Sequence, residues 1–271
     1  MNARLVGARI TRRDFIQQAS ISLVVASPFA RAIRLRVHCV VPAARADLIN
    51  GVLLGTEEAQ RTASLMSASV RLLRHEATDD PGSLSQNDDL SAIVGGHDAP
   101  SVMSLAGGTR GAIALLNLSA ADDGLRRSLC GAAVFHVAPS ETMLSRALTE
   151  TNAIQGARVA AWHPSLFRYG AEQLNDRYRA RFSGTPGMSA DAWCGWMAMK
   201  ILAESALRSR AETNAALIAW LSSSRARFDG HKGRALVFDA SGQLRQPLYV
   251  ITPEGAVSSE VVPLGSREEC R

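Results

Sequence analysis

Residues 34–66 read RLRVHCVVPAARADLINGVLLGTEEAQRTASLM, a short apolar run followed by a longer segment with a different period. The run at 34–41 is predicted to form a strand. In the segment after it, apolar or small residues recur every three or four positions, which predicts a helix with one buried face. The residues with this spacing are Leu48, Val52, Gly55, Ala59, Ala63 and Met66.

The same alternation of short apolar runs and helical stripes continues along the chain, and it is typical of β/α units around a largely parallel sheet. The polar, turn-rich stretch at 77–89 predicts a loop in place of one crossover helix. The C-terminal part changes to β runs separated by turn residues, which predicts an antiparallel meander. Further strands are predicted at 70–73, 90–94, 112–116, 130–137 and 159–162, helices at about 139, 172–182, 189–210 and 213–221, and the meander at 235–238, 248–251 and 257–262.

The N-terminus carries an export signal. Residues 11–17 read TRRDFIQ, an apolar stretch of a dozen residues follows, and Ala30-Arg31-Ala32 supplies small residues for cleavage. This pattern predicts a twin-arginine signal over 1–32, cleavage after Ala32 and a periplasmic location. The apolar stretch is shorter than the roughly 20 residues that a spanning helix needs. The alternative is a basic N-terminus that leads into an amphipathic helix.

The signal also accounts for most of the basic charge. Five of the 30 Lys and Arg residues and one of the 25 Asp and Glu residues lie within 1–32, so the rest of the chain has 25 basic and 24 acidic residues. A nucleic-acid-binding surface needs a concentrated surplus of basic residues, and a membrane-surface helix needs a polybasic run. The sequence after the signal has neither, so no nucleic-acid partner is expected.

The motifs of several enzyme classes are absent. The sequence contains no GxSxG, HExxH, GxxxxGK[ST] or GxGxxG pattern, so we expect no enzyme activity and no cofactor. The cysteines Cys39, Cys130, Cys194 and Cys270 include no CxxC pair, which argues against a zinc site. One disulfide is compatible with an oxidising compartment, and the pairing is left open.

Two polar residues follow the third predicted strand. His97 and Asp98 come directly after Ile93-Val94-Gly95-Gly96 and precede a helix. In open α/β sheets, ligands bind beyond the carboxyl ends of the strands, where loops and helix N-termini point donors into a crevice. Both residues are therefore candidate ligand contacts. The alternative is that Asp98 only caps the helix and that His97 is a solvated loop residue.

Two further loops offer candidates. Ser119 and Asp122 lie in a polar loop after the strand at 112–116 and could face the same crevice, although turn roles explain them equally well. Trp162 ends a strand and Tyr169 follows shortly after it, so both are candidate walls of a ligand pocket. Trp193 and Trp196 share a helical stripe with Met197 and are expected in the core.

Three segments resemble the branched-chain amino acid binding family of type I periplasmic solute-binding proteins, which serve ABC transporters. Gly51 to Ala59 is similar to the family's Gly-x-x-x-Gly-Ala-Glu-x-Ala helix, Ile93 to Gly96 to its ligand-side strand end, and Phe228 to Val250 to its closing segment. Tyr169 to Leu174 and Gln243 to Pro247 resemble more closely a subgroup associated with quinoprotein (pyrroloquinoline quinone) alcohol oxidation.

The chain departs from this pattern in two ways. Where amino-acid binders hold the ligand with a serine and a threonine, this sequence has Ala99 and Ala121, with Ser101 and Ser119 nearby as substitutes. The chain is also short between Glu150 and Gly156, where units of the second lobe are expected. Ligand closure by a hinge needs two walls, so the second lobe is expected to be reduced.

The resemblance implies an α/β, periplasmic-binding-protein-like fold with a parallel-sheet first lobe at 33–138, a reduced, mainly helical second lobe at 139–228 and a returning β segment at 229–271. It implies a monomeric, non-enzymatic substrate-binding component of an ABC-type uptake system for a small organic solute, with an inner-membrane permease as partner. The alternative is a periplasmic accessory protein of a quinoprotein oxidation system that has lost ligand binding. The expected ligand contacts are His97, Asp98, Ser101, Ser119, Asp122, Trp162 and Tyr169.

Overall fold

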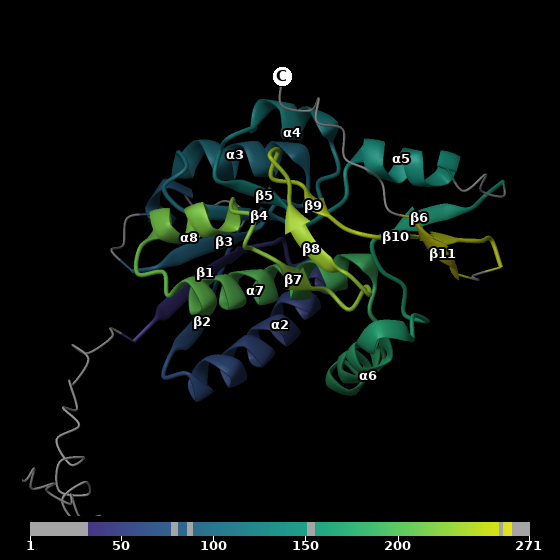
Figure 1. Ribbon diagram of the computed structural model, residues 1–271, viewed down its shortest axis with the longest axis horizontal. Coiled ribbons are helices and arrows are strands. Elements are labelled where there is room, and N and C mark those ends of the chain that lie inside the picture. Colours follow the sequence, from purple (N-terminus) through teal and green to yellow (C-terminus); the bar gives the residue numbers. More distant parts are fainter. Residues whose placement is uncertain (1–31, 77–80, 86–88, 151–154, 255–256, 262–271) are drawn as a thin grey trace, which may run out of the picture. The chain divides into compact units, whose positions relative to one another are not determined.

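The computed structural model describes residues 32–76, 81–85, 89–150, 155–254 and 257–261 (Figure 1). Contacts group the described residues from Ala32 onward into one compact unit. The expected export signal at 1–32 lies, apart from Ala32, outside the described residues. Among the residues that are described, no helix combines the length and the apolar composition that crossing a bilayer requires.

The centre of the fold is a parallel sheet of five strands in the order β2-β1-β3-β4-β5. Its parallel pairing confirms the α/β expectation, and the predicted strands are all present with bounds that differ by a few residues. Both faces of the sheet are covered, which explains why its strands read as continuous apolar runs. The strands are β1 (Arg34–Val40), β2 (Ser69–His75), β3 (Ser91–Gly95), β4 (Ala114–Asn117) and β5 (Val134–His136).

Two apolar cores lie on opposite faces of this sheet. Successive side chains of a strand point to opposite faces, so Leu115 joins the core under α3 and Leu116 joins the core that includes α2 and α7. The helix α4 and the 3-10 helix η1 fall in stretches where the sequence predicted loops. One face carries α2 (Ala46–Leu65), α7 (Ala190–Ser209) and α8 (Asn214–Leu221), and the other carries η1 (Pro81–Ser85), α3 (Ala99–Thr109) and α4 (Asp123–Ser128).

Helices α2 and α7 run parallel with their backbones in contact. A Cβ atom added to Gly51 would lie 1.9 Å from the Ala192 carbonyl oxygen, and one added to Gly195 would lie 2.5 Å from the Leu48 carbonyl oxygen. At Gly55 an added Cβ would lie 2.7 Å from the Cβ of Met199. The Gly-x-x-x-Gly spacing of α2 therefore creates a groove that accepts the backbone of α7.

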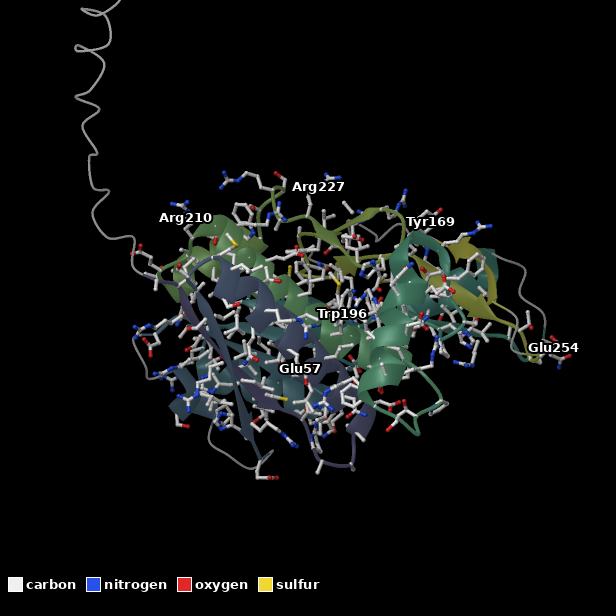
Figure 2. The ribbon with its side chains drawn as sticks, turned by 90° about the horizontal axis from the view of Figure 1, so that it is seen from below. Glu57, Tyr169, Trp196, Arg210, Arg227 and Glu254 are labelled. Carbon is white, nitrogen blue, oxygen red and sulfur yellow. The ribbon has the colours of Figure 1, made fainter. Side chains whose placement is uncertain are left out.

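Two adjacent glutamates of α2 form ion pairs with a third helix, α6 (Ala171–Arg181). Arg181 Nε lies 2.8 Å from Glu57 Oε1, and Arg177 Nε lies 2.7 Å from Glu58 Oε1. The other carboxylate oxygen of Glu58 accepts a hydrogen bond from Trp196 Nε1 of α7 at 2.8 Å. Glu57 and Trp196 lie on the same side of the molecule (Figure 2). Glu58 thus connects three helices, and we expect it to stabilise the fold more than an isolated surface ion pair does.

The C-terminal strands are antiparallel, as predicted, and they divide between two antiparallel sheets. Strand β8 belongs to the sheet β7-β8-β9, and β10 belongs to the sheet β11-β10-β6. Gln246 and Pro247 interrupt the β structure between β9 and β10. Gln246 Oε1 and the Pro247 carbonyl both accept hydrogen bonds from the buried Lys232 Nζ instead, at 2.7 and 2.9 Å. The elements are α5 (Glu141–Glu150), β6 (Arg158–Ala160), η2 (Arg168–Gly170), β7 (Phe228–Asp229), β8 (Ala235–Phe238), β9 (Leu244–Arg245), β10 (Leu248–Ile251) and β11 (Val257–Val261).

The division into lobes at 33–138, 139–228 and 229–271 stays a prediction. Helix α7 belongs by sequence to the second of these ranges, yet it packs along α2, which belongs to the first. One apolar core includes residues from all three ranges.

We expect Gly51→Ala to lower the free energy of unfolding by about 3 kcal/mol, because the new methyl group meets backbone atoms of α7 that cannot move aside. Gly107→Ala in α3 is the matched control, since an added Cβ there meets no atom within 4 Å. Alanine in that helix should raise stability by about 0.5–1 kcal/mol. Urea unfolding followed by circular dichroism measures both changes, and equal effects would contradict the packing argument.

Cys130 is disulfide-bonded, whereas Cys39 and Cys194 are free and buried. Burial raises the pKa of Cys39 to about 11 and of Cys194 to about 12, so both thiols stay protonated and unreactive. The sequence has one other cysteine, Cys270, which lies outside the described residues. Non-reducing peptide mapping of the folded protein should therefore recover Cys39 and Cys194 in peptides without a disulfide. A linkage that involves Cys39 or Cys194 would contradict this prediction.

Candidate ligand site at the carboxyl edge of the main sheet

The loops after β1, β3, β4 and β5 meet at one edge of the main sheet. From β1 the chain passes to β2 on one side, while β3 lies on the other side, so the strand order reverses between β1 and β3. In open α/β sheets, ligands bind beyond the strand ends at such a reversal, because the connecting loops diverge there.

Helices begin at this edge, and their first turns are capped differently. Asp98 accepts a hydrogen bond from the Ser101 amide and forms a capping box with that residue at the start of α3. Asp122 caps α4 in the same way, and Ser189 caps α7. Helix α2 has Arg45 at its N-cap position and no side-chain cap. A cation therefore stands where the other helices of this edge carry an oxygen acceptor.

The guanidinium of Arg45 connects three of the loops. Its Nη1 donates to the His97 carbonyl at 3.4 Å, and its Nη2 donates to Ser119 Oγ at 3.3 Å. Nη2 also forms an ion pair with Asp191 Oδ2 at 2.7 Å, and Asp191 lies in the first turn of α7. About a third of the Arg45 side chain and two fifths of the Asp191 side chain remain exposed, at 34% and 41%. The guanidinium is thus anchored and still accessible to solvent.

His97 and Ser119 complete this cluster. Ser119 Oγ donates to the His97 carbonyl at 3.2 Å, and the Ser119 amide donates to the Gly96 carbonyl. His97 Nε2 lies 3.4 Å from Asp98 Oδ2. The Ser101 amide, which donates to Asp98, holds the pKa of that carboxyl below its ordinary value. Because the Ser119 hydroxyl faces a backbone carbonyl and not an imidazole, the cluster lacks the nucleophile–base contact of acyl-transfer sites.

A buried hydrogen-bond network around Asn117 and Arg126 holds the loops that carry the cluster. Asn117 Nδ2 donates to His136 Nδ1 at 2.9 Å and to the Ala120 carbonyl at 2.8 Å. The fully buried Arg126 donates to Gln243 Oε1 and to the carbonyls of Ala120, Asp122 and Ala138. These bonds fix the backbone of the loops after β4 and β5, so the edge is rigid.

The structure brings together four of the seven residues that the sequence predicted: His97, Asp98, Ser101 and Ser119. Asp122 lies on the same edge, and its side chain caps α4. The other two lie elsewhere. Trp162 is fully buried, stacks on Trp193 at 5.9 Å between ring centroids and donates to Asn175. Tyr169 is exposed beside the β7–β8 hairpin.

The sequence analysis missed Arg45 and Asp191. Arg45 follows the first strand, so the rule that selected His97 after the third strand would also have found it. Asp191 gives no such signal, because an acid in the first turn of a helix is common for reasons of the helix dipole. No group of three His, Cys, Asp or Glu side chains with metal-binding geometry occurs in the part of the chain that the structure describes.

Comparison with known proteins places the fold. No family model and no curated protein matches the chain. Among solved structures, the branched-chain amino acid transporter substrate-binding protein LivJ of Streptococcus pneumoniae, in complex with isoleucine, is 12% identical with a TM-score of 0.65. That alignment covers 86% of this chain and 100% of that one.

Two further solved structures are similar. A solute-binding protein of an ABC transporter from R. palustris, in complex with benzoate, is 12% identical with a TM-score of 0.67, over 88% of this chain and 99% of that one. The leucine-binding protein LivK of Thermotoga maritima is 9% identical with a TM-score of 0.61, over 86% and 99%. At these identities the likeness establishes the fold, and this chain has a periplasmic-binding-protein-like α/β fold.

The buried network makes a prediction about pH. Burial, and then the positive charge of Arg126, lowers the pKa of His136 from 6.5 to about 3. The folded state therefore keeps His136 neutral where the unfolded chain binds a proton, so stability is lost as the pH falls from about 6.5 towards 3. The loss from this residue should reach about 2 kcal/mol at pH 5.

Urea unfolding of the wild type and of His136→Gln at pH 7 and pH 5 measures this loss. The variant should be less stable at pH 7 and should lose about 2 kcal/mol less between the two values. Equal pH dependence in the wild type and in His136→Gln would contradict the prediction.

Proposed function

We propose that this protein is the periplasmic, non-enzymatic substrate-binding component of an ABC-type uptake system, and that it binds a small organic acid at the carboxyl edge of the main sheet. The observation that carries the proposal is the accessible Arg45 guanidinium at the β1/β3 crevice, within a fold that solved substrate-binding proteins share. The expected twin-arginine signal supports a periplasmic location, and the proposed partner is an inner-membrane permease.

The chemistry of the crevice favours a carboxylate. A guanidinium offers parallel N–H donors to the two oxygens of a carboxylate, and one carboxylate oxygen, Asp191 Oδ2, already pairs with Arg45 Nη2. A solute carboxylate would take the place of Asp191, while Ser119 Oγ and His97 offer further polar contacts. Ala99 and Ala121 provide no hydroxyl where the amino-acid binders carry one. We therefore propose an organic acid and not a free amino acid.

We propose that the second wall of the crevice is small. Its described elements are β6, β10, β11, α5 and α6, with the chain short between Glu150 and Gly156. A small wall suits a small solute, because closure over the ligand then needs few contacts. We propose that the protein acts as a monomer, since a single chain supplies every residue of the Arg45 cluster.

The likeness to proteins associated with quinoprotein alcohol oxidation remains part of the proposal. Gln243 and Gln246 of that stretch accept hydrogen bonds from the buried cations Arg126 and Lys232. These contacts account for the two glutamines through the fold, so the stretch by itself does not specify the solute. Acids that arise from alcohol oxidation are the natural first candidates.

A thermal-shift screen of the mature chain tests the proposal. Carboxylates should raise the melting temperature by several degrees at saturation, since a ligand that binds only the folded state stabilises it. The panel includes organic acids, the matching amides and alcohols, amino acids and quinones. Arg45→Gln should weaken binding of the best acid at least about tenfold, as expected for the loss of a charge-assisted pair.

Arg179→Gln is the matched control, because Arg179 also pairs with an aspartate, Asp176, on the exposed side of α6, and has no contact with the Arg45 cluster. It should leave binding unchanged. If no compound raises the melting temperature, the transport proposal fails. Co-purification of such a ligand-free chain with a periplasmic dehydrogenase would instead favour the accessory role that the sequence left open.

A further inference from the structure

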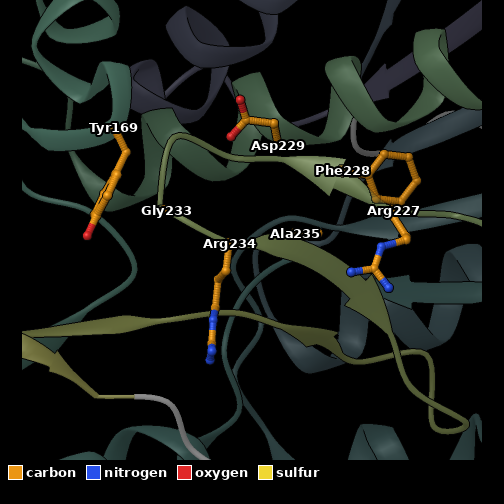
Figure 3. Close-up of a pocket in the computed structure, with 7 residues that line it drawn as sticks. All are labelled: Tyr169, Arg227, Phe228, Asp229, Gly233, Arg234 and Ala235. Atoms are coloured by element: carbon orange, nitrogen blue, oxygen red, sulfur yellow. The ribbon is translucent and has the colours of Figure 1, made fainter.

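A cavity separate from the Arg45 cluster lies between η2 and the β7–β8 hairpin. It has a volume of about 410 Å³, within the range of small-molecule sites, and shares no residue with the Arg45 cluster. Figure 2 shows Tyr169 and Arg227 along one edge of the molecule, and Figure 3 shows the cavity. It is lined by Tyr169, Arg227, Phe228, Asp229, Gly233, Arg234 and Ala235.

An unusual backbone conformation presents the Tyr169 ring to this cavity. Tyr169 has φ 58°, a left-handed value that costs a residue with a Cβ atom about 1 kcal/mol or more. Its carbonyl lies 3.2 Å from His231 Nδ1. Gly233 leaves space for the ring, because a Cβ there would lie 2.6 Å from Tyr169 Cε2. The side chain is nevertheless 55% exposed, so the turn positions an aromatic surface towards solvent.

The charge of the cavity is net positive, because two arginines and one aspartate line it. Arg227 and Arg234 are exposed, and among the described residues neither guanidinium has an acidic partner or a hydrogen-bond acceptor. Asp229 accepts a hydrogen bond from the His231 amide. In Figure 3 its carboxylate extends to one side of the hairpin, whereas Tyr169, Arg234 and Arg227 extend to the other.

We propose that this cavity is a second binding site, for a small aromatic carboxylate. A carboxylate satisfies the donors of Arg234 or Arg227 in a bidentate pair, and an aromatic body stacks on the exposed face of Tyr169. The site differs from the proposed solute site in offering a cation together with an aromatic surface.

Saturation-transfer NMR with benzoate tests this site in the mature Arg45→Gln chain, in which the proposed solute site is disabled. Benzoate should bind there, and cyclohexanecarboxylate and benzamide, which lack the ring face and the charge respectively, should bind at least about fivefold more weakly. Arg227→Gln combined with Arg234→Gln should abolish the benzoate signal. Tyr169→Leu should weaken it, and Tyr169→Phe should retain it.

Arg179→Gln in the same background is the control for a general loss of positive charge. Tyr169, Arg227, Arg234 and Arg179 are exposed and Arg45 is partly exposed, and unchanged melting temperatures will verify folding. The proposal is overturned if benzoate does not bind the Arg45→Gln chain, or if its binding survives the loss of both arginines. Because the test uses that background, its result does not depend on the proposed solute site.

Discussion

The contact between α2 and α7 is the constraint on which the rest of the structure depends. Gly51 and Gly55 on one helix and Gly195 on the other let the two backbones meet, and any side chain at these places would force them apart. The parallel register that results brings the N-termini of both helices to the same edge of the sheet. Arg45 and Asp191 meet there because they precede and begin these two helices.

Two buried cations connect the C-terminal segment to the main sheet. Arg126 donates to Gln243, and Lys232 donates to Gln246, whose amide in turn donates to the Val137 carbonyl. Buried charges need full hydrogen bonding to be tolerated, and Lys232 also lies 3.9 Å from the centroid of the Trp193 ring. The contacts that satisfy the charges thus also position the loops below the candidate site.

The candidate site combines a fixed backbone with one accessible charge. The amides and carbonyls around Ser119 and His97 are occupied by local hydrogen bonds, so the loops have little freedom. Arg45 is the exception, because its carboxylate partner is half exposed and belongs to another helix. An anion from solution can compete for that guanidinium, and this is the physical basis of the proposed binding function. The Tyr169 cavity differs from this site, because the Arg227 and Arg234 guanidiniums have no acidic partner among the described residues.

The sequence by itself determined the α/β class and most of the strands and helices, because these follow from local periodicity. It also selected the candidates His97, Asp98, Ser101 and Ser119, through the rule that ligands lie beyond parallel strand ends. Only the tertiary structure decided that Trp162 belongs to the core and that the C-terminal strands divide between two sheets. Likewise, only the fold pairs Arg45 with Asp191. These outcomes depend on contacts between residues far apart in the chain, such as the 146 positions between Arg45 and Asp191. No local sequence pattern predicts which residue, far away in the chain, a side chain contacts.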